Sequence, residues 1–86
     1  MDAQSIGNSY YKRAQNYILQ EDWSNATLEL RDGIVVCPKR SDFHVLLGHV
    51  YLKRKLPTMA KIHFRQALKL NPQDDTALQY LAKIGA

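Results

Sequence analysis

The sequence predicts an all-α fold in which two helix-turn-helix repeats are followed by a capping helix. The main observation is an internal repeat, because shifting residues 41–74 back by 34 positions places Tyr51 on Tyr17 and Pro72 on Pro38. Within each repeat, apolar residues recur at the spacing of an amphipathic helix. Each repeat also ends near a proline, which cannot continue a helix. We therefore expect one domain, 1–86, made of repeat 1 at 7–40, repeat 2 at 41–74 and a capping helix at 75–86.

Repeat 2 shows both of its helices clearly. Ser41 is the expected N-cap of the first helix, and Pro57 suits the first turn of the second helix. The apolar face of the first helix consists of Phe43, Leu47, Val50 and Tyr51. The apolar face of the second helix consists of Ala60, Phe64, Ala67 and Leu68. This pattern predicts two antiparallel helices joined by a tight turn.

The flanking helices follow the same logic. In repeat 1 we expect a helix from about Asn8 to Gln20 and a second one from Trp23 to Cys37. Gly33 should weaken that second helix by about 1 kcal/mol relative to alanine. The capping helix starts at acidic residues, and its apolar side consists of Leu78, Leu81, Ala82 and Ile84. It would cover the apolar face that the last helix pair of a solenoid otherwise exposes to water.

Several residues of repeat 2 occur at the spacing of a known family: Leu47, Gly48, Tyr51, Ala60, Phe64, Ala67 and Pro72. Through these residues the chain resembles the tetratricopeptide repeat family. Repeat 1 is a weaker copy, in which Arg13 and Gly33 replace the usual apolar residue and alanine. The resemblance implies a short right-handed α-solenoid that acts as a non-catalytic protein-protein interaction module.

The resemblance also implies where a partner binds, namely in the concave groove lined by outward residues of the leading helices. Those residues are Asn8, Tyr11, Lys12, Gln15, Asp42, Val45, His49, Leu52, Thr76, Gln79 and Lys83. Tyrosine and valine offer apolar contact, while asparagine, glutamine and histidine can hydrogen-bond a peptide backbone. We therefore expect a protein or peptide partner in this groove.

Some members of the family clamp the acidic C-terminal tails of heat-shock chaperones with lysine, arginine and asparagine. The matching positions here hold Tyr11, Gln15, Leu46, Thr76 and Tyr80. None of these side chains carries a charge that would pair with a terminal carboxylate, so we do not expect this clamp.

A narrower resemblance concerns the segments 44–53 and 59–68, which are similar to the C-terminal repeat segments of cyanobacterial J-domain proteins. The chain has no His-Pro-Asp motif, so no J-domain activity is expected of it. The resemblance implies instead a docking segment of a larger scaffold or co-chaperone-like protein.

Positive charge is concentrated in the second half of the chain. The net charge is +4, and residues 41–86 hold seven basic and three acidic side chains. A basic stripe is formed by Lys53, Arg54, Lys55, Lys61, Arg65 and Lys69. Its last three members recur every fourth residue and so share one helix face. The stripe is explained either by solubility and helix-dipole compensation or by binding of an acidic surface.

Two alternatives to groove binding follow. The first is binding of an acidic protein or nucleic-acid surface by the basic stripe, although no nucleic-acid-binding motif is apparent and we do not expect nucleic acid as the partner. The second is homo-oligomerisation, for example a homodimer, through the flat apolar ends of a short solenoid.

The sequence does not predict an enzyme. His44, His49 and His63 lack metal-ligand spacing, and no glycine-rich phosphate loop is present. We therefore expect no catalytic, metal or cofactor-binding residues and no cofactor. We interpret His44 as a packed core histidine and His63 as a histidine of the helix surface.

Two further features bear on location. No apolar run approaches the ~20 residues that a membrane span needs, so we expect no membrane partner. The single cysteine, Cys37, has no partner for a disulfide within the chain. Together these features favour a cytoplasmic location.

Overall fold

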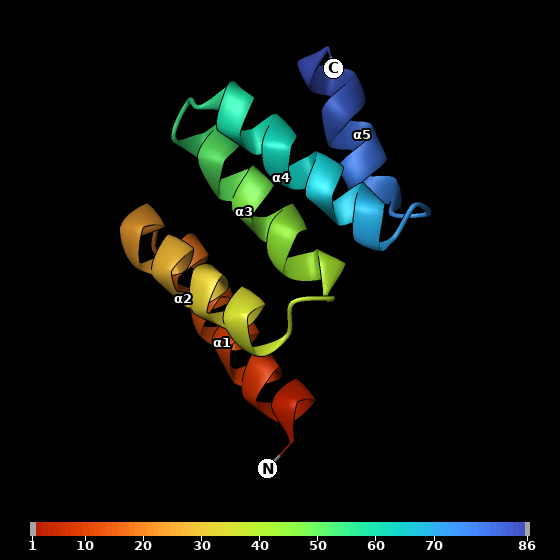
Figure 1. Ribbon diagram of the computed structural model, residues 1–86. Helices are drawn as coiled ribbons and strands as arrows, with labels where there is room; N and C mark the ends of the chain where they lie inside the picture. The colour runs from red at the N-terminus through yellow and green to blue at the C-terminus, as the bar shows by residue number, and fades with distance from the viewer. Residues whose placement is uncertain (1, 86) are drawn as a thin grey trace.

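The computed structural model describes residues 2–85, which form five α-helices in chain order (Figure 1). The helices are α1 (Ala3–Leu19), α2 (Trp23–Val36), α3 (Ser41–Lys53), α4 (Pro57–Leu70) and α5 (Asp75–Ile84). α1 packs against α2, α3 against α4, and α5 against α4, so the helix pairs follow one another along the molecule from the N-terminus to the C-terminus (Figure 1). The predicted all-α helical repeat fold is confirmed. None of these helices is both long and apolar enough to cross a bilayer.

The first helix begins earlier than the sequence pattern indicated. We expected it to start near Asn8, but α1 starts at Ala3. The cause is a cap at Asp2, whose carboxylate accepts a hydrogen bond from the Ser5 backbone N–H at 2.8 Å. Side-chain caps of this kind satisfy backbone donors that have no partner inside the helix.

The cap of α3 also differs from the prediction. Ser41 is the first residue of the helix, and Arg40 takes the N-cap position without making a side-chain cap hydrogen bond. Pro57 does lie in the first turn of α4, where its missing N–H costs nothing. The Arg40 side chain is therefore free for contacts with other helices.

Large side chains packed on glycines fix the distance between neighbouring helices. Phe64 of α4 is fully buried, and a Cβ atom on Gly48 of α3 would lie 2.6 Å from its ring. Phe43 of α3 is likewise fully buried, and a Cβ on Gly33 of α2 would lie 2.5 Å from its ring. A phenylalanine ring packed on a glycine thus joins the two helices of repeat 2, and a second such contact joins repeat 1 to repeat 2.

Gly33 is therefore not simply a weak point of α2. Glycine costs about 1 kcal/mol of helix propensity relative to alanine. At this position it also allows α3 to approach α2, because the Phe43 ring occupies the place of a methyl group. Two buried clusters result: one around Phe43 and Leu30 between α1, α2 and α3, and one around Phe64 between α4 and α5.

We predict that Gly33→Ala destabilises the protein although alanine is the better helix former. The new methyl group forces the Phe43 ring to move, and overpacking of this kind costs about 1–3 kcal/mol. Urea denaturation would measure the change in unfolding free energy. Ser24→Ala, at an exposed position of the same helix, is the control and should change it by no more than about 0.5 kcal/mol. A Gly33→Ala variant more stable than the parent would contradict the packing described.

Candidate functional site

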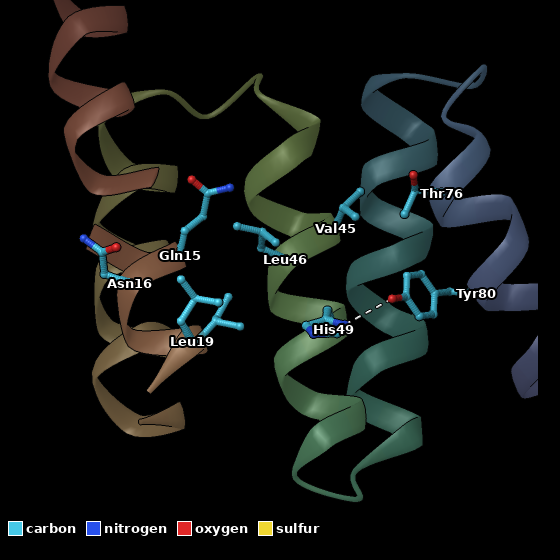
Figure 2. Close-up of a pocket in the computed structure, with 9 residues that line it drawn as sticks. Gln15, Asn16, Leu19, Val45, Leu46, His49, Thr76 and Tyr80 are labelled. Atoms are coloured by element: carbon cyan, nitrogen blue, oxygen red, sulfur yellow. Dashed lines mark hydrogen bonds between the residues drawn. The ribbon is translucent and has the colours of Figure 1, made fainter. Parts of the chain in front are cut away.

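A hollow of about 520 Å³ lies between α1, α3 and α5 (Figure 2). α1 contributes one wall, α3 the centre and α5 the opposite wall. Its lining residues are Gln15, Asn16, Ile18, Leu19, Val45, Leu46, His49, Thr76 and Tyr80. None of them is an aspartate, glutamate, lysine or arginine, so the hollow is lined by uncharged polar and apolar groups together with one histidine.

The hollow brings together part of the groove predicted from sequence. The shared residues are Gln15, Val45, His49 and Thr76. The prediction omitted the apolar Ile18, Leu19 and Leu46 and the polar Asn16 and Tyr80. Helical spacing could have revealed Tyr80, because it lies four residues after Thr76 and hence on the same side of α5.

His49 and Tyr80 connect two walls of the hollow. His49 Nδ1 and the Tyr80 hydroxyl oxygen share a hydrogen bond of 3.1 Å, drawn as a dashed line in Figure 2. Burial lowers the pKa of His49 below its ordinary value, and the positive charge of Lys53 lowers it further. The neutral imidazole is thus favoured at neutral pH.

The core holds Tyr80 in place. Its ring stacks on the ring of Phe64, with centroids 4.8 Å apart and planes 7° from parallel. Because Phe64 is fully buried against Gly48, the position of the Tyr80 hydroxyl is set by the packing of α4 on α3. This wall of the hollow is therefore preformed.

Arg40 binds two other residues of the predicted groove, Asn8 and Asp42. Its guanidinium donates two hydrogen bonds to Asp42, at 2.8 and 3.2 Å, and a third to Asn8 Oδ1 at 2.7 Å. It also lies 4.7 Å from the centroid of the Phe43 ring and 5.8 Å from that of Tyr11. The carboxylate of Asp42 raises the pKa of Arg40 above its usual range. Asn8 and Asp42 are therefore already engaged within the chain.

The remaining predicted groove residues do not line the hollow. Tyr11 packs against the first buried cluster, and Leu52 packs against the second. Lys12, Gln79 and Lys83 are exposed on the same leading helices. The Nζ atom of Lys83 lies 5.8 Å from the centroid of the Tyr80 ring.

The basic stripe lies outside the hollow. Lys53 is in the last turn of α3, Arg54 and Lys55 form the turn that follows, and the other three members lie along α4. Within residues 2–85 the ion pairs are Arg13–Glu29 and Arg40–Asp42, so no member of the stripe is paired. Five of its side chains are exposed, and Lys61 is partly buried.

A second hollow, of about 440 Å³, is lined by residues of α2, α3 and α4. His44 and His63 meet there, with their Nδ1 atoms 3.1 Å apart, and the ring of His63 stacks on Tyr51. The expectation that His63 lies on the helix surface is wrong, because it is half-buried and bonded to His44. Across residues 2–85, no group of three or more histidine, cysteine, aspartate or glutamate side chains is arranged to hold a metal ion.

Comparison with known proteins gives one positive finding. A family model described as tetratricopeptide repeat matches residues 41–74, the span from the start of α3 to the turn before α5. Repeats of this family generally support protein-protein interaction rather than catalysis. A search of curated proteins gave no match.

We predict that Arg40→Lys destabilises the protein by about 1 kcal/mol, because lysine cannot make the bidentate pair with Asp42 while also bonding Asn8. Thermal or urea unfolding would measure the loss. Arg54→Lys is the matched control, since Arg54 is exposed and makes no ion pair. Equal stabilities for the two variants would show that the Arg40 contacts contribute nothing specific.

The histidine pair predicts a pH dependence of stability. Burial lowers the pKa values of His44 and His63 below the ordinary 6.5, and the positive charges of His44 and Arg31 lower the pKa of His63 further. The folded state thus binds fewer protons than the unfolded state. The contribution of the two neutral histidines to the free energy of unfolding is complete above about pH 6.5, and it is lost as the pH falls below that value.

Urea unfolding between about pH 7.5 and pH 5.5 tests this prediction, because most carboxylates titrate below that range. The parent should lose unfolding free energy across the range, and the double variant His44→Gln, His63→Gln should lose less. An identical slope for both proteins would assign the pH dependence to other groups.

Proposed function

Residues 41–74 belong to the tetratricopeptide repeat family, and from this premise we propose that the protein is a non-catalytic binding module that holds a partner peptide in the hollow between α1, α3 and α5. The observation that carries the proposal is the lining of the hollow. Apolar side chains of Ile18, Leu19 and Leu46 are combined there with hydrogen-bonding groups of Gln15 and Thr76. Binding sites for peptides commonly pair apolar contact with a few well-placed polar groups.

The chemistry of the lining indicates the kind of peptide. Because no acidic or basic side chain lines the hollow, affinity should come from an apolar anchor residue and from hydrogen bonds to the peptide backbone. Binding should therefore depend weakly on salt. This expectation differs from a carboxylate clamp, which needs cationic side chains at the site.

Three broader statements remain predictions. They are that the module works within a larger scaffold or co-chaperone-like protein, that its parent resembles the J-domain proteins, and that it is cytoplasmic. Homo-oligomerisation also remains an alternative. Light scattering over a dilution series tests it, because a concentration-independent mass near 9.9 kDa would leave the hollow free for a foreign peptide.

Selection from a random peptide library, followed by affinity measurement on two matched variants, tests groove binding. Leu19 lines the hollow and is 83% exposed, whereas Val35 of α2 is 80% exposed and lies outside it. We predict that Leu19→Asp weakens binding of the selected peptides by about tenfold or more, since it places a charge against an apolar anchor. Val35→Asp should change the affinity by no more than about twofold.

Both positions are exposed, so neither substitution should unfold the protein, which circular dichroism would verify. Equal loss of affinity in the two variants, or loss only with Val35→Asp, would refute the hollow as the binding site. Selected peptides whose affinity falls steeply with added salt would refute the uncharged mode of binding.

A further inference from the structure

α5 docks on repeat 2 in the way that α3 docks on repeat 1. Ala77 and Leu81 of α5 are the 34-residue counterparts of Phe43 and Leu47 of α3, and all four side chains are buried. The helices α3 and α5 thus use the same positions to contact the preceding helix pair.

On α3, the helix face that points away from the preceding helix pair is covered by α4. The ring of Phe64 lies on Gly48, and His63 is bonded to His44. Met59 and His63 of α4 also close the second hollow against Arg31 of α2. In repeat 1 the equivalent pair, Leu30 on Ala14, is likewise fully buried.

On α5, the equivalent positions have no such cover within residues 2–85. Leu78 is the counterpart of His44 and is 48% exposed, and Ala82, the counterpart of Gly48, is exposed as well. Arg65 and Leu68 of α4 are the counterparts of Arg31 and Ile34. We call Leu78, Ala82, Arg65 and Leu68 the open face.

The open face is separate from the hollow already described. Thr76 and Tyr80 of α5 line that hollow, whereas Leu78 and Ala82 each lie two residues further along, roughly 200° around the helix. A ligand on one side of α5 therefore leaves the other side accessible.

Charge indicates what the open face accepts. Lys61 and Lys69 lie four residues before and after Arg65, so all three project along one side of α4, and none is paired within the described chain. Asp75 is the acidic residue in the first turn of α5. A second copy of this chain, with its net charge of +4, would be repelled, whereas an acidic partner would be attracted.

We propose that the open face binds an acidic amphipathic helix that lies outside residues 2–85. The visiting helix packs on α5 as α4 packs on α3, with one large apolar side chain over Ala82. Because Ala82 is one methyl larger than Gly48, a leucine fits this place, as Leu30 does over Ala14 in repeat 1. Acidic residues at the positions that Met59 and His63 occupy in α4 would face Arg65.

Two synthetic peptides provide the probe. Both have the sequence of residues 57–70 with Phe64→Leu and with Lys61, Arg65 and Lys69 each replaced by glutamine. One peptide also carries Met59→Glu and His63→Glu, and the other carries Met59→Lys and His63→Lys. A free helix of this length is marginal in water, and its helicity depends on the charges in its first turn, so circular dichroism measures the helicity of each free peptide. The ratio of the two dissociation constants, corrected for that helicity, is the readout. Fluorescence anisotropy of the labelled peptides measures it at low and at physiological salt.

The acidic peptide should bind about tenfold more tightly than the basic one at low salt, with a smaller ratio at physiological salt. Arg65→Glu should abolish or invert this preference. Ala82→Gln, an exposed substitution that blocks the anchor, should weaken the acidic peptide by about tenfold. The groove variant Leu19→Asp should leave its affinity unchanged.

Three results would overturn the proposal. Equal binding of the two peptides would show that the positive charge of the open face does not select an acidic helix. Loss of binding with Leu19→Asp but not with Ala82→Gln would move the acidic peptide to the hollow. A dimer in light scattering that Ala82→Gln converts to monomer would assign the open face to a second copy. Each result leaves the test of groove binding with library peptides intact.

Discussion

The close approach of a phenylalanine ring to a glycine is the constraint on which the structure depends. Phe64 occupies the space beside Gly48, and Phe43 occupies the space beside Gly33, at distances that leave no room for a Cβ atom. One contact closes the helix pair of repeat 2, and the other joins the two repeats. Because packed interiors tolerate neither voids nor overlap, these two contacts set the spacing of α2, α3 and α4.

The candidate binding site follows from this packing. The buried ring of Phe64 supports Tyr80 by stacking, and the Tyr80 hydroxyl bonds His49, so one wall of the hollow is continuous with the core. At the far end, Arg40 binds Asp42 internally and keeps that carboxylate from acting as a free charge. The hollow is uncharged because of its lining and also because a nearby charge is neutralised within the chain.

The repeat also explains why equivalent arginines have different surroundings. Arg31 lines the second hollow together with Met59 and His63 of α4, although its side chain is exposed. Its counterpart Arg65 is also exposed, but no described helix lies over it in the way that α4 lies beside Arg31. The same residue type at the same place in the repeat therefore lines a hollow between helices in one case and has no following described helix beside it in the other.

The sequence by itself determined the helix pairs, their order and part of the site. Residues 34 apart repeat, and helical spacing is local, so Gln15 and Thr76 could be assigned to one predicted groove, and both line the hollow. The start of α1 was missed because its cap, Asp2, lies before the apolar pattern begins.

Only the tertiary structure decided which side chains meet. Arg40 hydrogen-bonds Asn8, which is 32 residues away in the sequence, and His44 hydrogen-bonds His63, which is 19 residues away. It likewise showed that Gly33 accommodates a ring rather than merely weakening a helix. Periodicity assigns a residue to a face of its own helix, but it contains no information on the distance or orientation of the next helix. These depend on the packing of all the buried side chains together.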